Sequence, residues 1–217
     1  MPIIFSAICP HPPLILATVG SPEDRVQVKN TISSLEKMGR DMKKAGPEKI
    51  IISSPHLEWG FNVPLSFLAG RTLDEDGGGE NIQPYLIGAD APEFYFEEGR
   101  GVYGREIKNS KSKFALIASG DLSHRLKEDG PYGFHSDGPK FDQALVEALN
   151  KKNISAILKL DELYPQAGEC GLGSFAFMIG ILEAARVNWQ ADILSYEGPF
   201  GVGYLVANVK LQNYGSN

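Results

Sequence analysis

The sequence predicts a single α/β domain, residues 1–217, in which helices surround a central sheet. Three short apolar runs indicate buried strands, because each is uninterrupted and ends at a polar loop; they are 3–13 (IIFSAICPHPP), 49–56 (KIIISSPH) and 114–125 (FALIASGDLSHR). A helical pattern separates the first two runs, and a strand, helix and strand in succession favour a right-handed parallel crossover. The length of 217 residues is within the range of one α/β domain.

The composition is that of an ordinary globular protein, with 42% hydrophobic and 22% charged residues. A net charge of −6 provides no basic field, which disfavours nucleic acid or an anionic membrane as a partner. No apolar run approaches the roughly 20 residues of a membrane helix, and the N-terminus does not resemble a secretion signal, so we expect a cytoplasmic protein. Cys9 and Cys170 are expected to be thiols, and the sequence leaves homo-oligomerisation open.

The first helix is expected to begin at Ser21-Pro22, where an N-cap residue and an early proline precede two acids. It should end before Gly46-Pro47, which follow two lysines. The segments 61–69 and 82–87 are predicted to be strands on either side of the acidic, glycine-rich stretch 74–79, which we interpret as a solvated loop.

The second half of the chain alternates helical patterns with one more strand and a terminal hairpin. Helices are predicted at 90–109, 138–150, 154–160 and 171–187, and the hairpin at 191–196 and 203–211. The turn-rich segment 130–135 fits no regular element, so we expect a lid or a pocket wall there.

Three of the four histidines, His11, His56 and His124, lie just beyond predicted strands. Ligands of open α/β sheets bind beyond the carboxyl ends of the strands, which favours one shared site. A lone histidine at a strand end is more often structural than catalytic, but three together are not easily explained that way. Two imidazoles and a carboxylate suit a non-haem ferrous ion. We therefore predict His11, His56 and Glu169 as ligands, with Cys170 as the alternative third ligand.

The choice between Glu169 and Cys170 affects the metal. A thiolate would shift the preference toward zinc, copper(I) or iron in a redox role. His124 is expected to be a general acid and base, since its ordinary pKa lies near neutrality, and Asp121 could orient its ring. Pro12, Ser123 and His135 are the predicted substrate-pocket residues, although Pro12 could simply fix a turn and His135 could simply face solvent.

Five motifs resemble the LigB family, the catalytic subunits of class III extradiol ring-cleaving dioxygenases. They are CPHPPLI, SSPH, SGDLSHRL, GPYGFHSDGPKFD and AGECGLGSF. The match looks closest to the LigB-like domain of AmmeMemoRadiSam system proteins and to Memo-like proteins. The resemblance implies a mixed, largely parallel sheet flanked by helices, a ferrous ion bound by two histidines and an acid, and an acid/base histidine.

Within that resemblance, His11 and His56 match the metal histidines, and His124 matches the acid/base histidine. Ring-cleaving members have a glutamate as third ligand, whereas Memo-like members have a cysteine before the glycine that Gly171 matches. This chain has Glu169 and Cys170 side by side.

The leading functional hypothesis is an Fe(II)-dependent extradiol-type dioxygenase whose partners are dioxygen and a small aromatic substrate, catechol-like or aminophenol-like. One alternative is a zinc-dependent hydrolase, in which metal-bound water is the nucleophile. The other is a Memo-like metal-binding, redox or interaction protein that does not cleave rings.

Overall fold

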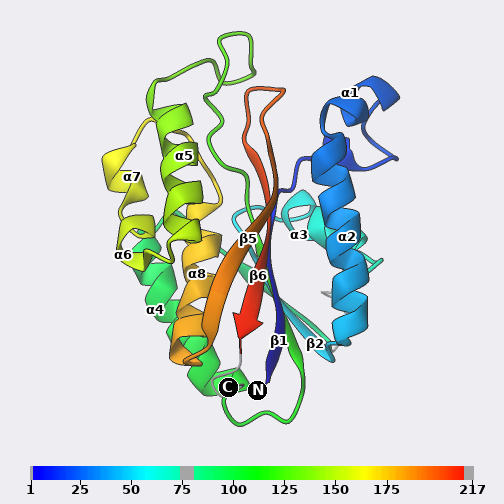
Figure 1. Ribbon diagram of the computed structural model, residues 1–217, viewed down its shortest axis with the longest axis vertical. Helices are drawn as coiled ribbons and strands as arrows, with labels where there is room; N and C mark the ends of the chain where they lie inside the picture. The colour runs from blue at the N-terminus through cyan, green and yellow to red at the C-terminus, as the bar shows by residue number, and fades with distance from the viewer. Residues whose placement is uncertain (1, 74–80, 213–217) are drawn as a thin grey trace.

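A six-stranded mixed sheet forms the centre of the molecule in the computed structural model, which describes residues 2–73 and 81–212 (Figure 1). The strand order is β3-β2-β4-β1-β6-β5. The strands are β1 (Ile3–Cys9), β2 (Lys49–Ser54), β3 (Ile82–Leu86), β4 (Phe114–Ser119), β5 (Asn188–Glu197) and β6 (Tyr204–Gln212). The first four are parallel to one another, and the terminal hairpin adds β6 antiparallel to β1. This confirms the predicted single α/β domain with a mixed, largely parallel sheet.

Helices cover both faces of the sheet (Figure 1). On one side lie η1 (Pro13–Ile15), α1 (Pro22–Gln27), α2 (Lys29–Ala45) and α3 (Trp59–Leu68). On the other side lie α4 (Pro92–Val102), the π-helical η2 (Tyr103–Ile107), α5 (Asp137–Asn150), α6 (Ile154–Ile157), α7 (Leu160–Leu163) and α8 (Leu172–Ala184). Each side has its own buried apolar cluster against the sheet. The helix α8 is buried nearly all round because it lies between the sheet and α4.

The segment 61–69 forms α3, so the prediction of a strand there was wrong. Short apolar runs do not distinguish a buried strand from a buried helix, and Pro64, inside α3, is a poor indicator of either. The expected first helix is divided at Val28 into α1 and α2, and the helix expected at 154–160 is two short helices, α6 and α7. The predicted loop 74–79 is outside the described residues.

The adjacent parallel strands β1, β2 and β4 all end at the same edge of the sheet. Cys9 is opposite Ser119, and Ser53 is opposite Ala118. The loops that follow these three strands therefore leave the sheet together. They carry the three histidines that the sequence singled out.

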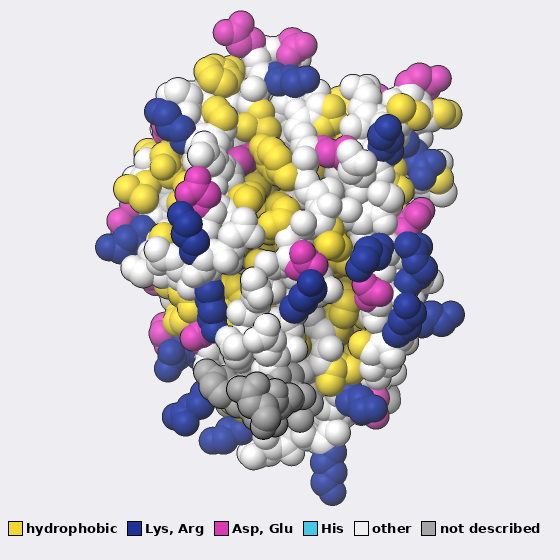
Figure 2. All heavy atoms as spheres, viewed as in Figure 1, with side chains coloured by type: hydrophobic (Ala, Val, Ile, Leu, Met, Phe, Trp, Pro, Cys, Tyr) yellow, Lys and Arg dark blue, Asp and Glu magenta, His cyan; other side chains and the backbone are white. Residues whose placement is uncertain are grey.

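The surface has mixed charge. On the face shown in Figure 2, Lys and Arg are dispersed among Asp and Glu rather than gathered into one basic patch. No helix in the described part of the chain combines the length and the apolar character needed to cross a membrane.

Candidate metal centre

His11, His56 and Cys170 form a group whose potential ligand atoms all lie within 4.8 Å of one another. The His11 Nε2 atom is 3.7 Å from the Cys170 Sγ atom, and the two imidazole rings meet edge to face with centroids 5.2 Å apart. His11 is buried, Cys170 is half-buried and His56 is exposed. The group therefore has one ligand in the protein interior and one at the surface, where an ion could enter from solvent.

The tautomer of His11 is set by Ser119. The Ser119 hydroxyl donates its only hydrogen to the Gly60 carbonyl oxygen, and the same Oγ lies 3.0 Å from His11 Nδ1. Because that hydrogen is already engaged, Oγ can only accept from His11, so Nδ1 carries the proton. The lone pair of a neutral His11 is then on Nε2, the nitrogen that faces Cys170. This is how metal-binding histidines are commonly oriented, through a hydrogen bond to the nitrogen that does not bind the ion.

The Gly60 carbonyl is available to Ser119 because of the sequence of α3. In a regular helix this oxygen would accept from the N–H four residues later, but that residue is Pro64, which has no N–H. Gly60 also permits the close packing of α3 against the end of β2, since a Cβ there would lie 2.1 Å from Ser54 Oγ. Two helix-disfavouring residues thus support the site.

The second group of potential ligands consists of Asp121, His124 and Cys170. Asp121 Oδ1 accepts a hydrogen bond of 3.0 Å from the His11 backbone N–H, and Oδ2 is 3.9 Å from His11 Nε2. The His124 Nε2 atom is buried and has no hydrogen-bond partner among the described residues. The ring of Tyr132 stacks on the His124 imidazole with centroids 5.0 Å apart.

Burial dominates the electrostatics of both groups. It raises the pKa of Asp121 to about 6, against the opposing effect of the His11 N–H. Burial and then the neighbouring His56 lower the pKa of His11 to about 3, and burial lowers the pKa of His124. Burial and Asp121 raise the pKa of Cys170. His11 and His124 are therefore neutral at pH 7, with lone pairs free to bind a metal or a proton, and the thiol would ionise when a cation binds.

Glu169 does not join His11 and His56. Its Oε2 accepts a hydrogen bond of 2.7 Å from the Leu172 N–H, at the start of α8. Glu169 and Cys170 both line a neighbouring cavity of about 340 Å³. Burial raises the pKa of this carboxyl to about 7. Among the described residues, Cys170 is thus the one of the two that the fold brings to the histidines.

The backbone explains why Cys170 is the residue presented. The Cys170 and Gly171 N–H groups both donate to the Asp121 carbonyl oxygen, at 3.3 and 3.0 Å, and the Asp121 N–H donates to Cys170 Sγ at 3.3 Å. A Cβ on Gly120 would lie 2.1 Å from the Gly171 Cα, so a side chain there would force the two loops apart. The start of α8 is consequently clamped to the loop after β4.

Of the three predicted pocket residues, only Pro12 lines the pocket that contains the histidines. Ser123 is fully buried beneath its loop, where its hydroxyl donates to the Ala167 carbonyl at 2.8 Å. His135 is held at the start of α5, where its Nδ1 accepts a hydrogen bond of 3.1 Å from the Asp137 N–H. Both side chains thus form hydrogen bonds with the backbone rather than line the pocket.

The histidine pocket has a volume of about 350 Å³, and His11, His56, Asp121 and His124 all line it. Several of its walls are aromatic: Trp59, Tyr132, Phe200 and Tyr204. Tyr132 lies in the segment predicted to be a lid or pocket wall, and the sequence is compatible with Trp59 in the core or in a pocket wall. Phe200 and Tyr204 belong to the terminal hairpin, which the sequence analysis did not place at the site.

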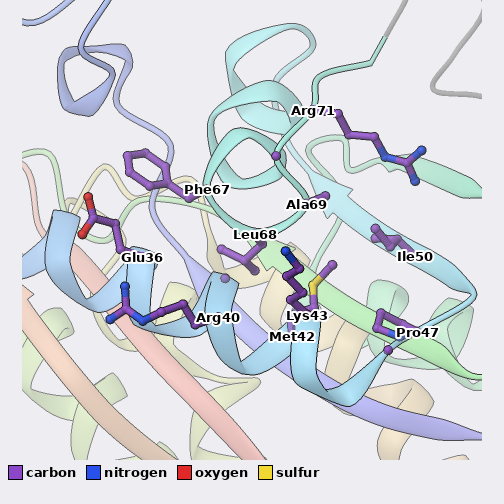
Figure 3. A pocket seen from close by; sticks show the side chains of 13 residues that line it. Glu36, Arg40, Met42, Lys43, Pro47, Ile50, Phe67, Leu68, Ala69 and Arg71 are labelled. Carbon is purple, nitrogen blue, oxygen red and sulfur yellow. The ribbon is translucent and has the colours of Figure 1, made fainter.

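A larger cavity of about 760 Å³ lies between α2, α3 and β2 (Figure 3). Its charged lining consists of Glu36, Arg40, Lys43 and Arg71, and it contains no histidine or cysteine. It offers none of the convergent ligands of the histidine pocket, so volume alone does not identify the site.

Comparison with known proteins identifies the family of the chain. Residues 56–207 match the family model described as the catalytic LigB subunit of aromatic ring-opening dioxygenase. The chain belongs to the LigB family. Membership of this family supports a dioxygenase-like or Memo-like fold and an oxidoreductase-type enzyme that binds metal. The two groups of His, Cys and Asp described above are the candidate metal sites in this chain.

Two further proteins resemble this chain, one in sequence and one in fold. The chain is 29% identical to Protein CA_C1420 of Clostridium acetobutylicum, in an alignment that covers 94% of this chain and 56% of that protein. The chain therefore spans little more than half of this relative. The crystal structure of the uncharacterized protein JW3007 from Escherichia coli K12 has the same fold, with a TM-score of 0.59 at 13% identity over 95% of this chain and all of the other.

Proposed function

We propose that this LigB-family protein is an iron-dependent dioxygenase of the extradiol type, with the ion bound by His11, His56 and Cys170. The observation that supports it best is the meeting of these three side chains beside an aromatic pocket that also contains Asp121 and His124. Ferrous iron in such a site supplies the electron transfer that allows dioxygen to react with an aromatic ring.

The protein residues would prepare the substrate. A catechol or aminophenol would have to give up a proton to bind as a chelating anion, and the His124 Nε2 atom, which has no hydrogen-bond partner among the described residues, would accept it. Asp121, with a coulombic effect that favours the imidazolium, would stabilise His124 after it accepts the proton. Tyr132, stacked on His124, would shield the ring from solvent.

The test is oxygen consumption by protein purified and loaded with Fe(II) without oxygen, using catechol and 2-aminophenol. His124→Phe should retain iron and lose turnover by about a hundred- to ten-thousand-fold, the usual contribution of general acid–base catalysis. His135→Phe is the matched control, because His135 lies outside the pocket, and it should keep turnover. Full activity of His124→Phe would remove His124 from the mechanism.

The second candidate is a Memo-like metal-binding protein that does not cleave rings. The specific observation that favours it is the presence of Cys170, rather than Glu169, beside His11 and His56. Stoichiometric iron with no oxygen consumption on any aromatic diol or aminophenol would support this candidate. A zinc-dependent hydrolase would instead show ester or amide hydrolysis by the zinc-loaded protein.

A further inference from the structure

The histidine pocket lacks a positively charged side chain. None of its lining residues is Lys or Arg. The segments outside the described residues, Met1, 74–80 and 213–217, contain no Lys or Arg either, so every such side chain of this sequence has been placed, and none lines this pocket.

The two cations on the adjoining loop are engaged elsewhere. The Lys127 Nζ donates a hydrogen bond of 2.7 Å to the Pro199 carbonyl oxygen. The Arg125 side chain packs beside Gly168, where a Cβ would lie 3.5 Å from Arg125 Cγ. Neither residue lines the pocket.

The negative groups in and beside the pocket are already sufficient to balance a divalent ion. Asp121 lines the pocket, is only 6% exposed and forms no ion pair with Lys or Arg. Cys170 lies beside the pocket rather than in its lining, and it would be a thiolate when it binds a metal. One divalent ion would be balanced by these two groups. A ligand with a further negative charge on its ring would therefore meet aromatic walls and a carboxylate, with no cation to compensate it.

The walls fit a flat, uncharged ring. Trp59, Phe200 and Tyr204 present aromatic surface, and Tyr132 already stacks on the His124 ring. The volume of about 350 Å³ is at the lower end for small-molecule pockets, which suits one ring rather than several.

We propose that this pocket selects single-ring aromatic diols and aminophenols with uncharged substituents, and discriminates against rings that carry a carboxylate. The inference rests on the proposed function, which supplies the metal site and requires two adjacent hydroxyl or amino groups on the ring of the ligand. It goes beyond that function by assigning the charge of the substrate.

The test compares two ligands of nearly the same shape, 3,4-dihydroxybenzamide and 3,4-dihydroxybenzoate. Binding is measured by calorimetry to protein loaded with Zn(II), which is redox-inert, so no turnover is needed. The benzamide should bind about 10- to 100-fold more tightly, since an uncompensated buried charge costs at least as much as an unpaired buried polar group. Quenching of fluorescence from Trp59, absent in Trp59→Phe, locates the ligand in this pocket.

A variant that supplies the missing cation provides the reciprocal test. Leu57 lines the pocket and is 68% exposed, so Leu57→Arg should leave the fold intact and raise the affinity for the benzoate relative to the benzamide. Val26→Arg is the matched control, because Val26 is 66% exposed on α1 and does not line the pocket. The ratio of its affinities for the benzamide and the benzoate should equal that of the parent.

Equal or tighter binding of the benzoate by the parent would overturn the inference, and so would failure of both ligands to bind. A preference for the benzamide without oxygen consumption by the iron-loaded protein would support the inference while refuting the dioxygenase. The two proposals therefore fail separately.

Discussion

Replacing Cys170 and Glu169 one at a time should separate a metal ligand from a helix cap. Cys170→Ala removes one of three converging donors, the one whose Sγ lies 3.7 Å from His11 Nε2. Loss of a residue that merely supports a ligand typically costs 10- to 100-fold in metal affinity, so loss of a ligand should cost at least about 100-fold. The hydrogen bond from the Asp121 N–H to Sγ is lost as well, which should lower the free energy of unfolding of the metal-free protein by only about 1 kcal/mol.

Glu169→Gln should behave in the opposite way. The amide oxygen of glutamine can still accept from the Leu172 N–H, so the cap of α8 is kept. Because Glu169 belongs to neither group of converging ligand atoms, metal affinity should stay within about threefold of the parent, less than the effect of altering even a supporting residue.

Competition with a chromophoric chelator measures both affinities. Cobalt(II) provides an independent readout, since a bound thiolate gives a sulfur-to-metal charge-transfer band in the near ultraviolet. We expect that band in Glu169→Gln and not in Cys170→Ala. Loss of metal from Glu169→Gln, with full binding by Cys170→Ala, would refute the assignment of Cys170 and restore the carboxylate as third ligand.

Two further predictions concern residues outside the ligand set. Ser119→Ala should weaken metal binding by about 10- to 100-fold without changing which residues bind, because His11 loses the acceptor that holds the proton on Nδ1. Chelator competition measures this affinity, and an unchanged value would show that the acceptor is irrelevant. Burial raises the pKa of Asp142 to about 6, so its contribution to stability is present below its unfolded value and is lost as pH rises through about 6. Asp142→Asn should therefore flatten the pH dependence of the free energy of unfolding by up to about 3 kcal/mol between about pH 3.5 and about pH 7, and identical urea-denaturation profiles of variant and parent would contradict this.

The parts of the fold that the sequence predicted correctly are those in which local pattern and tertiary context agree. The strands β1, β2 and β4 are mainly apolar, and all three are almost completely buried. The segment 61–69 has the same apolar character, but it is a helix covering one face of the sheet. Periodicity cannot separate these cases in a run of nine residues, since both are buried.

The sequence could predict the three histidines of the site, because the ends of strands determine their positions, but it could not predict the third ligand. His11, His56 and His124 follow β1, β2 and β4, and parallel strands bring such residues to one edge. Glu169 and Cys170 are neighbours in sequence, so no spacing rule decides which one faces the histidines. Hydrogen bonds between the start of α8 and the Asp121 carbonyl decide it, and they join segments about fifty residues apart.

The misassigned segment is also the one that connects the fold to the chemistry of the metal site. Were residues 61–69 a strand, Gly60 would not lie in the first turn of a helix, and its carbonyl would not be left free by the missing N–H of Pro64. The Ser119 hydroxyl donates to that carbonyl, and as a result it can only accept from His11 Nδ1. The lone pair of His11 is thereby directed at Cys170. A proline that removes one helical hydrogen bond thus fixes the protonation of a buried imidazole, and with it the direction from which a metal ion can bind.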